Sequence, residues 1–174
     1  MKKRILFIVL TVLMVFLACV STQQSSTDPS DNEEDILPGW VVSPRVSDIG
    51  FFGIGYAKKA TKELSIEAAL KNARADVSKQ LYKKIKSTVV DYAKEKAIDV
   101  DSKKLRNFYD ALSESITNKY IKVSRTNLYQ EAGNGIWLEV LYEKGDFSSG
   151  VRTAVRSINV EISGFNKEEL AARF

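Results

Sequence analysis

The chain has 174 residues, of which 44% are hydrophobic and 28% are charged, and this composition is typical of one globular domain. Its formal charge of +4 depends on the basic residues at 2–4, because the rest of the chain has 23 basic against 22 acidic residues, a net charge of +1. That balance argues against a nucleic-acid partner, which requires a dense basic surface. The chain has no histidine and one cysteine, so we expect no histidine-based catalysis, internal disulfide, metal site or other cofactor.

The N-terminus has the layout of a secretory signal peptide. A basic start is followed by an apolar run over 5–20, which only Thr11 interrupts, with small residues at its exit. This run is shorter than the roughly 17–25 residues with which a helix crosses a bilayer. Its length favours a signal peptide at 1–18 over the alternative of an uncleaved membrane helix.

The only cysteine, Cys19, lies where the apolar run ends and a polar tract begins. The stretch Phe16-Leu17-Ala18-Cys19 resembles the bacterial lipobox, in which the cysteine is diacylated and becomes the new N-terminus. It departs from the usual pattern at Phe16, where leucine is common, and at Leu17, where a smaller residue is common. The alternative is a plain signal peptide cut near Ala18. The resemblance implies attachment to a bacterial envelope membrane, and Val20, in place of the aspartate that retains enteric lipoproteins at the inner membrane, favours the outer one.

The segment 19–37 is rich in Ser, Thr, Gln, Asp and Glu. It has too few apolar side chains to fold, so it predicts a flexible acidic tether after the lipidated cysteine. The remaining residues, 38–174, are expected to form a single domain, with Trp40 anchoring its edge.

The stretch 51–57 predicts a strand with Gly53 and Gly55 on one face. Two glycines on one face favour the close approach of a helix. Apolar residues at spacings of three and four over about 64–97 predict that long helix. We expect Ala69 and Ala73 to keep it close to the glycines.

Further elements follow this helix. A second helix is expected over about 103–120, with Asp101 as its N-cap. Strands at 121–132 and 136–143 flank "GNG", a hairpin signal. A helix to about 158 is favoured next, with a strand at "INVEIS", 158–163, as the alternative. The segment 167–174 is either a last helical turn or a frayed end.

The order of these elements predicts an α+β fold of two layers, in which a small, mainly antiparallel sheet is packed on one face by the long helix and the second helix. Apolar surface left at the end of so long a helix would favour a homodimer.

One ordered set of motifs suggests a family. It consists of "PGW" at 38–40, "GIGYA" at 53–57 and "AALKNARADVSKQL" at 68–81. This set resembles the LPP-twenty family of small bacterial envelope lipoproteins and related flagellar-motor accessory domains, over roughly 38–144. Arg74, within the helix motif, could pair with an acidic group or cap a strand carbonyl. The resemblance implies a non-enzymatic envelope domain whose partners are envelope or flagellar proteins.

Two other functions remain open. One is an accessory factor that binds lipid or wall material, and an elongated apolar cavity would favour it. The other is a histidine-free envelope hydrolase, which would need a pocket with a Ser-Lys pair or paired carboxylates.

Overall fold

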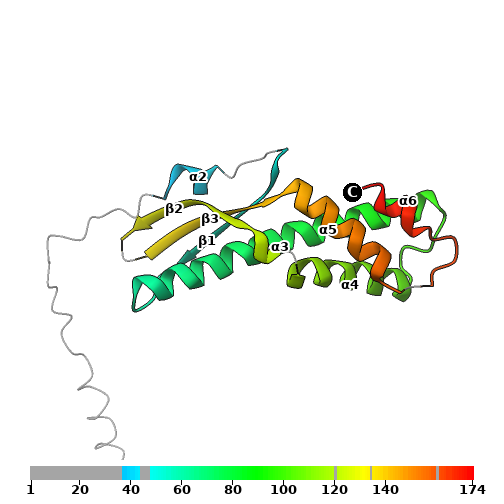
Figure 1. Ribbon diagram of the computed structural model, residues 1–174, viewed down its shortest axis with the longest axis horizontal. Helices are drawn as coiled ribbons and strands as arrows, with labels where there is room; N and C mark the ends of the chain where they lie inside the picture. The colour runs from blue at the N-terminus through cyan, green and yellow to red at the C-terminus, as the bar shows by residue number, and fades with distance from the viewer. Residues whose placement is uncertain (1–36, 44–47, 120, 134, 160) are drawn as a thin grey trace, which may run out of the picture. The chain divides into compact units, whose positions relative to one another are not determined.

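The structure, a computed structural model, describes residues 37–43, 48–119, 121–133, 135–159 and 161–174. The signal peptide expected at 1–18, Cys19 and the tether up to residue 36 lie outside these described residues. The helices are α2 (Gly39–Val42), α3 (Lys62–Glu95), α4 (Lys103–Lys119), α5 (Lys144–Ser157) and α6 (Lys167–Ala171), the strands are β1 (Gly50–Ala57), β2 (Arg125–Ala132) and β3 (Gly135–Glu143), and η1 (Ile121–Val123) is a short 3-10 helix. The predicted α+β class is confirmed, with α3 lying along the sheet (Figure 1).

The sheet of the described residues has three strands in the order β1-β3-β2, and both pairs are antiparallel. β2 and β3 form the predicted hairpin, in which Gly133 adopts a φ of 55° that favours glycine. In the register of β1 with β3, Gly53 lies opposite Val140 and Gly55 lies opposite Leu138. These positions share one face of the sheet, and α3 covers that face.

The contact between α3 and β1 depends on two glycines. A Cβ on Gly55 would lie closer than 3.0 Å to the backbone of Ala69 and Ala73, and one on Gly53 would meet the backbone of Ala73 equally closely. Side chains other than hydrogen therefore do not fit at these strand positions. Ala69 and Ala73 are fully buried, so the helix side of the contact is also made of small residues. The helix expected on the glycine face is α3.

Polar side chains of α3 also bind the outer edge of β1. Asn72 Nδ2 donates to the carbonyl oxygen of Tyr56 at 2.8 Å, and Gln80 Nε2 donates to that of Phe52 at 2.7 Å. Between them, the Ile54 N–H donates to Asp76 Oδ2 at 3.2 Å. β1 is an edge strand, and edge strands expose backbone groups that can pair with another chain. The three side chains, four residues apart on α3, therefore cover part of that edge.

Beyond the sheet, α3 forms the support of a helical core. The buried side chains on its stripe become larger in this half, from Val77 and Leu81 to Tyr92. α4 packs mainly against α3 and α5, and α6 packs against α5. The buried stripe of α3 is thus covered by other elements of the described part of the chain, and the homodimer stays a prediction.

Two local predictions differ from the structure. α4 is capped by Ser102 in place of Asp101, because the Leu105 N–H donates to Ser102 Oγ at 3.3 Å. The strand expected from residue 121 begins at Arg125, since η1 occupies 121–123. For the C-terminal segment, the helical alternative holds as α6.

We expect Gly55→Val to destabilise the domain by about 3 kcal/mol, the upper end of the usual penalty for overpacking, because the atoms in its way belong to the backbone. Urea titration measures the loss. Gly145→Ala is the matched control, since a Cβ there meets no atom within 4 Å and should leave stability unchanged or slightly higher. Equal midpoints for Gly55→Val and the unsubstituted protein would disprove the packing argument.

Candidate functional site

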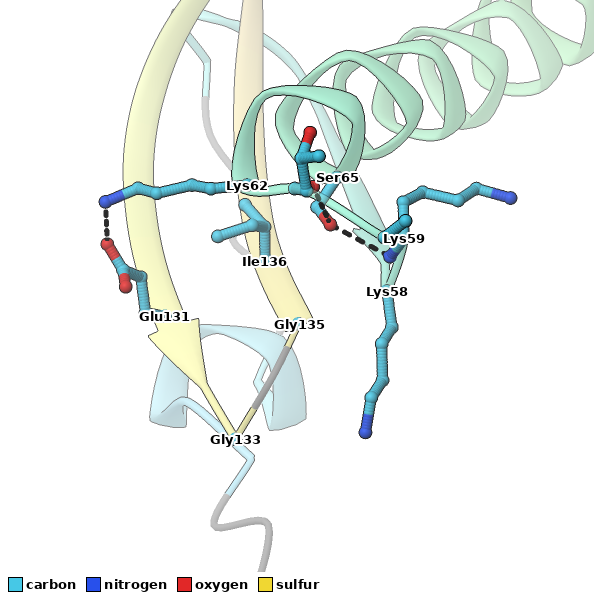
Figure 2. A pocket seen from close by; sticks show the side chains of 10 residues that line it. Lys58, Lys59, Lys62, Ser65, Glu131, Gly133, Gly135 and Ile136 are labelled. Carbon is cyan, nitrogen blue, oxygen red and sulfur yellow. Dashed lines mark hydrogen bonds and ion pairs between the residues drawn. The ribbon is translucent and has the colours of Figure 1, made fainter.

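A hollow of about 460 Å³ opens where β1 passes into α3 beside the hairpin turn (Figure 2). Its lining includes three lysines, one acidic residue, two glycines of the turn and the N-cap of α3. The described residues that line it are Lys58, Lys59, Ala60, Thr61, Lys62, Ser65, Glu131, Gly133, Gly135 and Ile136. We call this place the hairpin-end hollow.

Local contacts define the two sides of the hollow. Thr61 begins α3 as its N-cap and accepts a hydrogen bond from the Leu64 N–H at 3.3 Å. On the hairpin side, a Cβ on Gly135 would collide with the ring of Tyr56. The Tyr56 ring also packs on Trp137, with ring centroids 4.7 Å apart. Glycine at position 135 therefore leaves room for the Tyr56 ring beside the turn.

Ser65 lines the hollow, where a nucleophile would have to lie, but its hydroxyl forms hydrogen bonds to the backbone. Its side chain is buried, and its hydroxyl donates to the carbonyl oxygen of Thr61 at 2.9 Å and accepts from the Lys59 N–H at 2.9 Å. The amino groups of Lys58, Lys59 and Lys62 point in three different directions away from it (Figure 2). In this hollow, the described side chains form no serine–lysine pair that could activate the hydroxyl.

The charges around the hollow are mostly positive. Lys62 forms an ion pair with Glu131, and Tyr129 donates to Glu131 Oε1 at 2.8 Å. The hydrogen bond with Glu131 raises the pKa of Lys62, and the same bond lowers the pKa of Glu131. Within the described part of the chain, the side chains of Lys58 and Lys59 form no ion pair. The hollow can attract a carboxylate or phosphate on a partner's surface, but its diverging lysines do not enclose one.

The residues singled out in the sequence lie in separate places. Gly53, Gly55, Ala69 and Ala73 form the buried α3–β1 contact and do not line this hollow. Trp40 is a partly buried residue of α2. Cys19 lies outside the described residues.

Arg74 joins α3 to η1. Its Nε donates to Ser124 Oγ at 3.2 Å, and its Nη2 donates to the carbonyl oxygen of Lys122 at 3.2 Å. Neither partner is acidic, and Lys122 belongs to η1, so the carbonyl that Arg74 binds is not part of a strand.

The structure also shows a polar residue that the sequence pattern hides. Glu139 of β3 is fully buried on the sheet face away from α3, where Asn127 Nδ2 donates to its Oε1 at 2.6 Å. Its Oε2 has no hydrogen-bond partner among the described residues. The alternation of side chains along 136–143 places Glu139 on the sheet face away from α3. The sequence pattern does not indicate that this face is buried at Glu139.

The described residues offer neither a cluster of metal ligands nor a membrane-spanning helix. They contain no group of three or more Cys, Asp or Glu side chains that could hold a metal ion. None of their helices combines the length and the apolar character required to cross a membrane.

Comparisons of this chain with protein-family models, with curated proteins and with solved structures found no match. The likeness to the LPP-twenty family therefore rests on the sequence motifs alone.

We expect Ser65 to hold the connection between β1 and α3 and to have no catalytic role. Ser65→Ala should therefore lower the free energy of unfolding by about 1–3 kcal/mol, because it leaves the Lys59 N–H without an acceptor. We also expect a fluorophosphonate probe, which labels activated serines, to leave the unsubstituted protein unlabelled. Chemical denaturation and mass spectrometry measure these two outcomes.

Ser87→Ala is the control, since the Ser87 hydroxyl is exposed and bonds only to the Lys84 carbonyl of its own helix. This variant should keep its stability within about 0.5 kcal/mol. Labelling that Ser65→Ala abolishes and Ser87→Ala leaves intact would instead identify Ser65 as a nucleophile.

Proposed function

We propose that this chain is a lipid-anchored protein of a bacterial cell envelope whose domain, 38–174, binds other envelope or flagellar proteins and catalyses no reaction. The observation that carries the proposal is the position of Cys19. The chain's only cysteine stands at the end of a signal-like apolar run, and a polar tract follows it. The motifs that resemble the LPP-twenty family support the same assignment.

The anchor has a simple physical basis. One acyl chain gives only marginal membrane binding, whereas two or more hold a protein stably, because each buried methylene adds about 0.8 kcal/mol. A thioether at Cys19 would also remove a free thiol that is prone to oxidation outside the cytoplasm. The 18 residues from Cys19 to Ile36 would reach roughly 20–25 Å as a random coil.

The hairpin-end hollow is the surface that we assign to a protein partner. Its lining carries the cationic side chains of Lys58 and Lys59. Tyr129, which is 43% exposed, adjoins the hollow by donating to the lining residue Glu131. Aromatic and cationic side chains are common in protein interfaces, and charges at a rim mainly steer association. A partner with an acidic surface would fit this hollow.

The hydrolase alternative receives less support. It requires a pocket in which a nucleophile meets a base. In the hairpin-end hollow, the hydroxyl of Ser65 is bonded to backbone groups on both sides and the lysines diverge from it. We therefore prefer a binding role for this surface.

The proposal predicts that Cys19→Ser abolishes the incorporation of radioactive palmitate and moves the protein from the membrane to the soluble fraction. The domain should remain folded, because its core lies within 51–174. Metabolic labelling and membrane fractionation measure both effects.

A Cys19→Ser, Ser21→Cys double variant is the sharpest control. It restores a thiol two residues away but removes it from the lipobox-like stretch, so it should remain unlabelled. Equal labelling of the unsubstituted chain and Cys19→Ser would exclude lipidation at this residue.

A further inference from the structure

A second hollow, of about 400 Å³, lies at the other end of β1 from the hairpin-end hollow. The start of β1, the middle of α3, the start of α5 and the segment after α6 meet there. The described residues that line it are Asp48, Gly50, Phe51, Lys84, Lys144, Phe147, Ser148, Arg173 and Phe174. We call it the aromatic hollow, and its volume is within the range of about 300–1,000 Å³ that is usual for small-molecule sites.

Three phenylalanine rings form the apolar wall of the aromatic hollow. Phe51 and Phe147 meet edge to face, with ring centroids 5.0 Å apart, and Phe147 and Phe174 do so at 6.0 Å. Phe147 is almost fully buried, whereas Phe51 and Phe174 are partly buried. Because Phe147 contacts both other rings, the three form one continuous apolar wall.

Positive charges stand at the rim of this wall. Lys84 and Lys144 are exposed, and neither side chain has an ion pair in the described part of the chain. The third cation, Arg173, is already engaged, because its Nη1 donates to Glu95 Oε1 at 2.9 Å and its guanidinium lies 5.0 Å from the centre of the Tyr92 ring. Against these three cations, the described lining residues carry two carboxylates, the Asp48 side chain and the terminal carboxylate of Phe174.

We propose that the aromatic hollow binds an amphiphilic anion, whose apolar chain packs against the three phenylalanines while its carboxylate or phosphate head meets Lys84 and Lys144. Each part of the hollow contributes a different selectivity. The rings favour an apolar body through burial of its surface. The two unpaired ammonium groups disfavour a cationic head and make an anionic head preferable to a neutral one. This inference goes beyond the proposed function and does not depend on lipidation at Cys19.

Photo-crosslinking on the full chain in isolated membranes tests the proposal. A decanoate that carries a diazirine on its chain is the probe, and mass spectrometry locates the modified peptides. We expect saturable labelling of peptides that contain Phe51, Phe147 or Phe174. Excess decanoate or decyl phosphate should suppress it, and whichever competes better identifies the preferred head group. Decanol should compete poorly because it is neutral.

Two kinds of variant give independent readouts. Lys84→Glu with Lys144→Glu should reduce labelling at least about fivefold, since two favourable charge contacts of ordinary surface strength become repulsive. Ser148→Phe should reduce it by filling the hollow, without a change of charge. The matched controls are Lys83→Glu and Ser149→Phe, exposed neighbours that do not line the hollow, and these should label like the unsubstituted chain.

The proposal is overturned if labelling is not saturable, or if decanol competes as well as decanoate. It is also overturned if both lining variants label like their controls while circular dichroism shows that they are folded. Loss of labelling in the lining variants but not in the controls supports it.

Discussion

The contact between α3 and the glycine face of β1 organises the rest of the domain. Gly53 and Gly55 leave no space for a Cβ beneath the backbone of Ala69 and Ala73, so the helix lies nearer to this strand than ordinary side chains allow. Three polar side chains on one edge of α3 add hydrogen bonds to the outer edge of β1: Asn72, Asp76 and Gln80. The packing fixes the distance between the two elements, and the bonds fix how the strand runs along the helix. The sheet and the helical core therefore share one support, because α3 continues past the sheet into α4, α5 and α6.

Both hollows follow from this arrangement, because they lie at the two ends of β1. The hairpin-end hollow forms where β1 passes into α3, and it is polar because the connecting residues 58–61 are exposed. The aromatic hollow forms where β1 begins beside α5, and it is apolar on one side because Phe51 and Phe147 extend the helical core to the surface. Under the proposed function, the chain is anchored to a membrane near its N-terminus, and the two unlike hollows would bind a protein and an amphiphile separately. Neither proposed role requires the other.

The sequence predicted the parts of the fold that depend on regular spacing. Alternating glycines in 51–57 indicated the strand and the helix on it, the stripe over about 64–97 indicated α3, and "GNG" indicated the hairpin. Features that depend on partners far apart in the chain could not be predicted in this way. Asp76 looks like an ordinary solvated residue until its bond with the Ile54 N–H, 22 positions away, is seen. The aromatic hollow joins residues from 48 to 174 and has no local signal. The predicted N-cap of α4 is wrong because aspartate and serine are equally good caps, so the sequence does not distinguish Asp101 from Ser102. In the structure, Ser102 accepts the capping hydrogen bond.

Hydrogen exchange at the amide of Ile54 tests the central claim most directly. If Asp76 covers the edge of β1, this amide should be protected in the unsubstituted protein although it faces no neighbouring strand. In Asp76→Ala its protection should fall by about tenfold or more, because a hydrogen bond to a charged group contributes about 1.5–3 kcal/mol. The amides that pair β1 with β3 should change much less, and Lys79→Ala, an exposed neighbour on α3, should leave the whole strand unaffected. An Ile54 amide that exchanges as fast as an uncovered edge amide in the unsubstituted protein would contradict the account.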